Sequence, residues 1–203
     1  MAKLYFRYGT VGSAKTLNLL AVAHNYGQQN KRAFIIKPEL DVRFGRELVH
    51  SRAGVEKQAD LLVGPETQLD AGGFEGVYCI LVDEAQVLSP FVIDQLRKVA
   101  RDEEIPVICY GLRTDFRTRL FAGARRLMEV ADSIEEIKTT CNYCNRKAIF
   151  NLKLCDGVPT LAGPTIDLGT EEKYLPACAA CYTSKLVEAG WELPSSREIG
   201  ELG

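Results

Sequence analysis

The feature that most constrains this chain is a glycine-containing loop between a short apolar segment and an apolar helical pattern near the N-terminus. Strand, loop and helix in this order present backbone amides and a helix N-terminus to a phosphate, with a lysine for the β- and γ-phosphates and a hydroxyl for Mg²⁺. We therefore expect the loop to bind a nucleotide; a turn before an ordinary core helix is the alternative. The loop residues are Gly9, Thr10, Val11, Gly12, Ser13, Ala14, Lys15 and Thr16.

One position of this loop departs from its usual form. The residue before the lysine is normally glycine, and here it is Ala14. Glycine is favoured there because it has no Cβ to crowd the phosphate or to resist a positive φ. We expect an active loop to hold Ala14 at a negative φ, with its methyl group turned away from the phosphates.

Alternating strand and helix patterns over the first two-thirds of the chain predict an α/β fold. Four short apolar runs are rich in β-branched and aromatic residues, which is typical of strands buried on both faces of a parallel sheet. Ser89 and Pro90 provide an N-cap and a first helical residue for the second of two helical patterns. The sequence thus indicates a doubly wound or related parallel sheet flanked by helices. The predicted strands are residues 3–8, 32–36, 77–82 and 107–110, and the predicted helices are residues 16–28 and 90–101.

Two acidic residues, Asp83 and Glu84, directly follow the apolar run of residues 77–82. The carboxyl end of a buried parallel strand faces the crevice in which α/β sheets bind ligands. We expect Asp83 to hold Mg²⁺ directly or through water, and Glu84 to accept the proton of an attacking hydroxyl. A solvated turn is the alternative, and the phosphate loop favours the functional interpretation.

Four of the seven cysteines form two Cys-x-x-Cys pairs, Cys141 with Cys144 and Cys178 with Cys181. Four thiolates complete a tetrahedral Zn²⁺ site with no open position, so the predicted metal is structural. A pair of disulfides or four unrelated thiols is the alternative, but the chain shows no export signal, which favours metal. Cys79 and Cys109 lie in apolar runs and are expected in the core.

The length, charge and apolar runs of the chain limit its possible partners, its location and its number of domains. The chain has 203 residues and a formal net charge of −2, with no basic stripe of the kind that binds a nucleic acid polymer. Its longest apolar run, residues 77–82, is far too short to span a membrane, and Lys3 and Arg7 interrupt any secretory segment. We expect a soluble, cytoplasmic protein with a nucleotide-binding core in residues 1–139. A small zinc-binding domain and tail are expected in residues 140–203, where cysteine pairs and Gly and Pro turns begin.

The ordered set of motifs resembles the cytosolic type of thymidine kinase found in bacteria and humans. After the phosphate loop come Asp-x-Arg-Phe at residues 41–44, Leu-Val-Asp-Glu-Ala-Gln at 81–86, Tyr-Gly-Leu-Arg-Thr-Asp-Phe-Arg at 110–117, and the cysteine pairs flanking Lys173 and Tyr174. The resemblance implies a core related to the RecA-type ATPases, a homotetramer, and a zinc-held lasso loop over the base. It also implies transfer of the γ-phosphoryl group of ATP to the 5′-hydroxyl of thymidine in nucleotide salvage.

The resemblance also implies roles for individual residues. Lys15 and Thr16 would serve the phosphates and Mg²⁺, Asp83 the metal, and Glu84 the proton of the 5′-hydroxyl. Arg43 would lie near the phosphates at the transfer site, with Asp41 supporting its loop. The thymine pocket would be formed by Leu112, Phe116, Phe121 and the lasso residue Tyr174.

The chain departs from the family pattern at a few positions. The family usually has Met where Val11 stands and Phe where Val87 stands, so we expect a roomier nucleoside pocket. The lasso segment, residues 165–170, has one glycine where a pair is common. Two other functions compete with the kinase: a nucleotide-sensing protein that has lost catalysis through Ala14 and Val11, and a RecA-like ATPase with a zinc finger for DNA.

Overall fold

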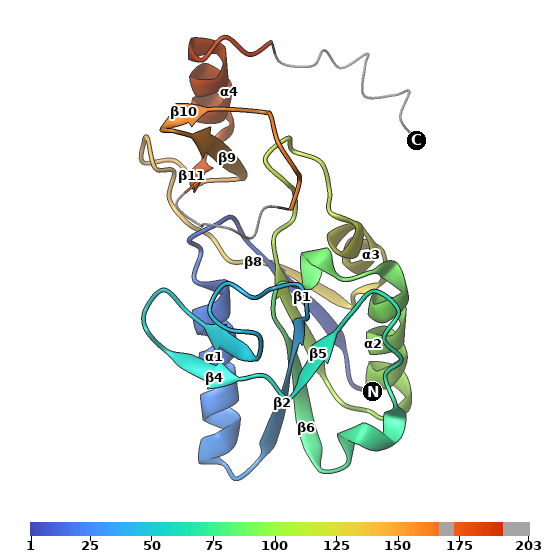
Figure 1. The fold of residues 1–203 in the computed structure, drawn as a ribbon. Coiled ribbons are helices and arrows are strands. Elements are labelled where there is room, and N and C mark those ends of the chain that lie inside the picture. Colours follow the sequence, from blue (N-terminus) through green and yellow to red (C-terminus); the bar gives the residue numbers. More distant parts are fainter. Residues whose placement is uncertain (167–172, 193–203) are drawn as a thin grey trace.

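The computed structural model describes residues 1–166 and 173–192, and its main body is a parallel sheet flanked by helices (Figure 1). The sheet has six strands in the order β5-β2-β6-β7-β1-β8, and every neighbouring pair is parallel. The predicted α/β parallel sheet is therefore confirmed. The strands are β1 (Leu4–Tyr8), β2 (Arg32–Pro38), β5 (Leu61–Val63), β6 (Val77–Val82), β7 (Val107–Gly111) and β8 (Ser133–Glu136).

Helices cover both faces of this sheet (Figure 1). Helix α1 (Lys15–Gln28) packs Leu19 and Leu20 against one face, and α2 (Pro90–Asp102) lies with α3 (Ala122–Val130) on the other. Strand β6 serves both layers because successive side chains point to opposite faces: Leu81 packs with the α1 cluster and Ile80 with the α2 and α3 cluster. The predicted N-cap of α2 is confirmed, since the Ser89 hydroxyl accepts a 3.3 Å hydrogen bond from the Val92 amide.

Both predicted helices and all four predicted strands form within two residues of their expected ends. The sequence patterns missed the two edge strands, β5 and β8, because they are short and β8 is half polar. They also missed α3 and the hairpin of β3 (Leu48–His50) and β4 (Glu56–Gln58). Two 3₁₀ turns, η1 (Ala71–Phe74) and η2 (Ala85–Val87), complete this part of the chain.

A second, antiparallel sheet follows β8, with the order β10-β9-β11. It consists of β9 (Phe150–Cys155), β10 (Val158–Pro159) and β11 (Tyr174–Ala177), and α4 (Ala179–Glu188) packs on it. Leu152, Tyr182 and Leu186 form its own small core with the cysteine pairs. We call this sheet and helix the annex. The division of the chain into domains at residue 139 stays a prediction, and most of the predicted lasso segment, residues 167–170, lies outside the described residues.

The annex stands over the carboxyl edge of the main sheet, where the loops after β1, β6 and β7 emerge (Figure 1). Cys79 and Cys109 are fully buried in the main core, as predicted. Within residues 1–166 and 173–192, no helix combines the length and apolar character needed to cross a bilayer.

Candidate active site

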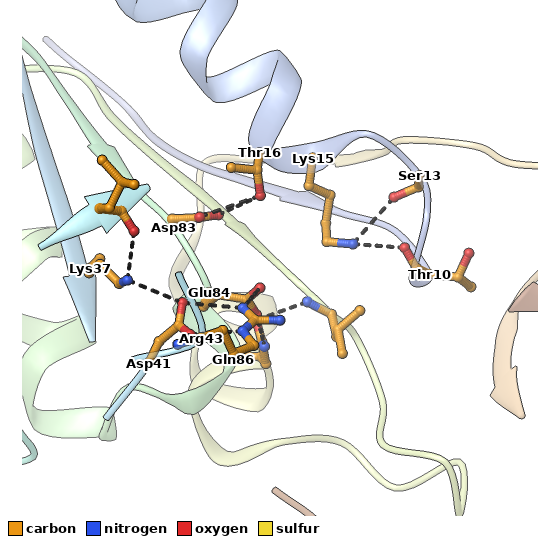
Figure 2. Close-up of polar contacts among 12 residues, drawn as sticks. Thr10, Ser13, Lys15, Thr16, Lys37, Asp41, Arg43, Asp83, Glu84 and Gln86 are labelled. Carbon is orange, nitrogen blue, oxygen red and sulfur yellow. Dashed lines mark hydrogen bonds and ion pairs between the residues drawn. The ribbon is translucent and has the colours of Figure 1, made fainter. Parts of the chain in front are cut away.

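The predicted phosphate loop follows β1 directly and runs into α1, which begins at Lys15. The Lys15 ammonium donates a 2.7 Å hydrogen bond to the Thr10 carbonyl and lies 3.4 Å from the Ser13 hydroxyl, so the lysine folds back over the loop (Figure 2). Gly9 is required at the start: a Cβ there would lie 2.3 Å from the Ser13 hydroxyl oxygen and 2.5 Å from the Ile137 carbonyl oxygen. The backbone at Gly9 is therefore packed too closely to admit a side chain, and Lys15 is held by the loop itself.

Ala14 corrects one expectation from the sequence. Its φ is 60° and its ψ is 29°, so the residue is left-handed, and the prediction of a negative φ was wrong. The physical reason is local: Ala14 is the N-cap of α1, where the chain must turn from the loop into the helix. The left-handed conformation costs an alanine about 1–2 kcal/mol relative to its usual one, a cost that glycine avoids.

Thr16 and Asp83 face each other from the first turn of α1 and the carboxyl end of β6 (Figure 2). The Thr16 hydroxyl lies 3.3 and 3.4 Å from the two carboxylate oxygens of Asp83. Burial, together with the neighbouring Glu84 carboxylate, raises the pKa of Asp83 to about 7. A hydroxyl and a carboxylate at this separation are the oxygen ligands that Mg²⁺ takes beside a nucleotide, and a cation here would offset the buried charge. The residues present thus fit Mg²⁺.

Glu84 is held by two partners. Its Oε1 accepts a 2.6 Å hydrogen bond from Arg43, and its Oε2 accepts a 2.5 Å hydrogen bond from the Gln86 amide (Figure 2). Burial alone would raise the pKa of Glu84, but the Arg43 guanidinium and the Gln86 amide overcome this and hold the pKa below its usual range. Glu84 also has a positive φ of 48°, a strained conformation of the kind found at functional sites.

Arg43 is itself oriented by Asp41. The Arg43 guanidinium donates hydrogen bonds of 2.8 and 3.2 Å to the two carboxylate oxygens of Asp41, which also lies 3.5 Å from the Lys37 ammonium. Burial would raise the pKa of the Asp41 carboxyl, but Arg43 and Lys37 lower it below its usual value. The buried Asp41 side chain therefore fixes the direction in which Arg43 reaches Glu84.

One cavity of about 440 Å³ brings together most of the residues predicted to bind the nucleotide and the nucleoside. Gly9, Thr10 and Asp83 are not in its wall, although Asp83 contacts the wall residue Thr16. Val87 is in the wall with Val11, so both positions that carry a smaller residue than the family pattern face the cavity. The predicted residues in the wall are Val11, Gly12, Ser13, Ala14, Lys15, Thr16, Arg43, Glu84, Leu112, Phe116, Phe121 and Tyr174.

Aromatic rings form part of the same wall. The ring of the buried Phe116 lies 6.3 Å from that of Tyr174, at a tilt of 48°. Lys153 of the annex is buried against the Phe116 ring, with its ammonium 4.6 Å from the ring centre. A flat, partly polar ligand suits such a wall, since aromatic faces pack against it while nearby polar groups fix its orientation.

The four predicted metal ligands meet in the annex. The sulfur atoms of Cys141, Cys144, Cys178 and Cys181 all lie within 4.8 Å of one another, and those of Cys144 and Cys178 are 3.7 Å apart. Each of these cysteines is a free thiol. Tetrahedral Zn²⁺ with bonds of about 2.3 Å to sulfur requires sulfurs roughly 3.8 Å apart, so the cluster fits zinc.

Comparison with known proteins decides the family. Residues 2–182 match the model of the family described as thymidine kinase. The chain belongs to the thymidine kinase family. It is 42% identical over 187 residues to the thymidine kinase of Streptococcus gordonii, covering 90% of this chain and 96% of that protein. It is 40% identical over 187 residues to that of Streptococcus pyogenes serotype M3, covering 90% and 97%.

Among solved structures, the chain is similar to a Pif1 helicase from Candida albicans, with a TM-score of 0.41 and 9% identity over 67% of this chain and 36% of that one. A likeness of that strength bears on neither the substrate nor the site of this thymidine kinase family member.

Several cavity residues of this family member were not predicted from the sequence. Asn151 of β9 and the hairpin residues His50, Ser51 and Arg52 line the cavity. The sequence indicated Gln86 only as part of the motif at residues 81–86. In the structure Gln86 links Glu84 to Leu112: its side-chain amide donates a hydrogen bond to Glu84, and its Oε1 accepts a 3.0 Å hydrogen bond from the Leu112 amide. An isolated polar residue in a strand or hairpin carries no spacing signal, so only the fold reveals these positions.

Proposed function

We propose that this chain catalyses the ATP-dependent phosphorylation of the 5′-hydroxyl of thymidine, in nucleotide salvage. Membership of the thymidine kinase family supports the reaction. The observation that carries the proposal is that a single cavity contains both a phosphate loop and an aromatic wall, with Arg43 and Glu84 lining it as well. A donor phosphate and an acceptor nucleoside can therefore meet inside one cavity.

On the donor side, the chain supplies positive charge and backbone amides. The N-terminus of α1 is proposed to face the phosphates, and the Lys15 ammonium would exchange its loop partners for the β- and γ-phosphate oxygens. Thr16 and Asp83 would hold Mg²⁺, which when bound neutralises charge on these phosphates. The raised pKa of Asp83 supports this role, because a buried carboxyl without a cation resists ionisation.

On the acceptor side, Glu84 is the proposed base. Its lowered pKa keeps it ionised at neutral pH, so it can accept the proton of the 5′-hydroxyl as that oxygen attacks phosphorus. Arg43 holds the Glu84 carboxylate and brings a guanidinium to the cavity wall, where it can stabilise charge on the transferred group. Leu112, Phe116, Phe121 and Tyr174 are proposed to enclose the thymine.

Three further parts of the proposal concern the molecule as a whole. Zinc at the cysteine cluster would have a structural role, because four thiolates leave no open coordination position. A homotetrameric state rests on the family resemblance alone, and light scattering on purified protein tests it. A cytoplasmic location is also proposed, in keeping with the cytosolic type of kinase that the chain resembles. The nucleotide-sensing alternative is not favoured, because Lys15, Thr16, Asp83 and Glu84 are all present.

Radiolabelled phosphoryl transfer from ATP to a panel of deoxynucleosides tests the function. We expect thymidine to be phosphorylated with the highest kcat/KM, and Lys15→Met to abolish transfer. Lys3→Met, a substitution of the same type at an exposed position outside the cavity, is the matched control. Absence of transfer to every nucleoside by folded, zinc-loaded protein would reject the proposed function.

A further inference from the structure

Asn151 connects three segments that are distant in sequence. It lies on β9 of the annex and is 4% exposed. Its Oδ1 accepts a 2.9 Å hydrogen bond from the Val11 amide of the phosphate loop, and its Nδ2 donates a 3.0 Å hydrogen bond to the Thr114 carbonyl. The same side chain lines the cavity. A single buried amide thus joins the annex to the phosphate loop and to the segment after β7.

The chemistry of these two bonds is specific to an amide side chain. One partner is a backbone donor and the other a backbone acceptor, so the side chain must carry an acceptor and a donor at once. Aspartate has the same shape but, when ionised, only accepts. A leucine of similar size does neither, and it would leave the partly buried Val11 amide and the buried Thr114 carbonyl without this partner, which is costly.

The positions that Asn151 holds belong to the cavity wall. Val11 lines the cavity, and Asp115 and Phe116 of the wall directly follow Thr114. Asn151 is in turn held by its strand, since β9 pairs with β11 in a register that sets Asn151 opposite Pro176, and its neighbour Leu152 is fully buried. Through this side chain the annex therefore contacts Val11 and the segment after Thr114 in the cavity wall.

We propose that Asn151 is a positioning residue that clamps Val11 and the segment after Thr114 to the annex and so sets the geometry of the nucleoside pocket. The kinetic consequence rests on the proposed function; the contact itself does not. Residues 12–16 of the loop continue into α1, which packs on the main sheet, so the phosphate cradle depends less on this clamp. Losing the clamp should therefore weaken thymidine binding more than ATP binding.

The first test uses Asn151→Leu. Asn151→Leu loses both hydrogen bonds, so we expect the KM for thymidine to rise by about tenfold or more, while the KM for ATP changes less than about threefold. Zinc content and the cooperativity of thermal unfolding should match wild type. A thymidine KM within about twofold of wild type in this folded variant, or equal changes in both KM values, would overturn the proposal.

The second test uses Asn151→Asp and a pH profile. The introduced carboxylate still accepts from the Val11 amide but repels the Thr114 carbonyl. Once protonated, it both accepts and donates, as the native amide does. Burial favours the protonated form, so kcat/KM of N151D relative to wild type should rise as the pH falls from about 8 to about 6. Asn30→Asp adds the same charge at an exposed site, and its ratio should stay flat. A flat ratio for N151D rejects the clamp, even where Asn151→Leu fails to fold.

A third measurement is independent of catalysis. Hydrogen exchange of the Val11 amide, followed by NMR, should be slow in wild type and faster in Asn151→Leu, with the amides of β6 unchanged. If wild type proves to have no kinase activity, the proposed function fails while this measurement still decides the clamp. Equal exchange of the Val11 amide in both proteins would overturn it.

Discussion

Arg43 and Glu84 form a close ion pair in the wall of the cavity, with Nη2 of the arginine 2.6 Å from Oε1 of the glutamate. Both side chains are largely buried, at 16% and 17% exposure. An ion pair at this depth is less screened by solvent than a surface pair. The pair therefore does two things at once: it keeps the proposed base ionised, and it fixes a cation beside the position where phosphoryl transfer is proposed.

Glu84→Gln removes the proton acceptor and preserves the size of the side chain. We expect kcat to fall by roughly 10² or more, because general-base catalysis contributes about that much, while ATP binding persists. Steady-state kinetics and an ATP titration measure the two quantities. Glu103→Gln, at an exposed position, is the control and should behave as wild type. Near-normal turnover of Glu84→Gln would show that Glu84 is not the base.

Arg43→Ala should shift the pH dependence of kcat/KM. Activity requires ionised Glu84, so it is lost as the pH falls through the pKa of that carboxyl. Burial raises this pKa, and Arg43 is the largest of the groups that lower it, so removing Arg43 should move the pKa upward. The acidic limb of the profile should therefore move to higher pH in the variant, in addition to any loss of rate. Arg46→Ala, an exposed neighbour, should leave the limb in place. An unmoved limb in Arg43→Ala would contradict the role assigned to the pair.

Zinc binding gives a prediction about the annex. Purified protein should contain about one zinc per chain, and Cys141→Ser should lower the zinc content, the melting temperature and the affinity for thymidine together, because metal binding is coupled to folding. Cys155→Ser removes an exposed thiol outside the cluster and should change none of these. Elemental analysis, thermal unfolding and thymidine titration provide the measurements. Stoichiometric disulfides in place of metal would reject this prediction.

The sequence predicted the parts of this molecule that have a local pattern. The buried strand β6 and the capped helix α2 were visible because an apolar run and a Ser-Pro pair are local signals. The edge strand β8, with the sequence Ser-Ile-Glu-Glu, has no such signal and is defined by its pairing with β1. Asn151 was invisible for the same reason: its partners, Val11 and Thr114, are 140 and 37 residues away.

The backbone conformation of the phosphate loop was harder to predict than the position of the loop in the fold. The residues of the phosphate loop were placed correctly at the start of α1, yet the φ of Ala14 was predicted with the wrong sign. Side-chain preference argued for a negative φ, since a residue with a Cβ resists the left-handed region. The turn between β1 and α1 overrode that preference, because the backbone direction is fixed by two elements packed in the core.

Ala14→Gly tests this strained position. The left-handed φ of 60° costs alanine about 1–2 kcal/mol, whereas glycine loses somewhat more chain entropy on folding, about 0.4–1 kcal/mol. The difference predicts that Ala14→Gly raises the free energy of unfolding by roughly 1 kcal/mol, measured by chemical denaturation. Ala21→Gly makes the same change on the exposed side of α1, at a helical position, and should lower stability by about 1 kcal/mol instead.

The same substitution also decides whether Ala14 impairs the site. Lys15 already lies over the loop and α1 already begins at that residue, so the cradle is formed with alanine in place. We therefore expect ATP affinity and thymidine turnover of Ala14→Gly to change by less than about tenfold, which corresponds to roughly 1.4 kcal/mol. A gain in turnover far above tenfold would mean that the methyl group obstructs the phosphates, and it would favour the nucleotide-sensing function. If Ala14→Gly and Ala21→Gly instead lower the free energy of unfolding equally, the left-handed backbone at Ala14 is contradicted. An alanine loses stability on replacement by glycine only where its φ is already negative.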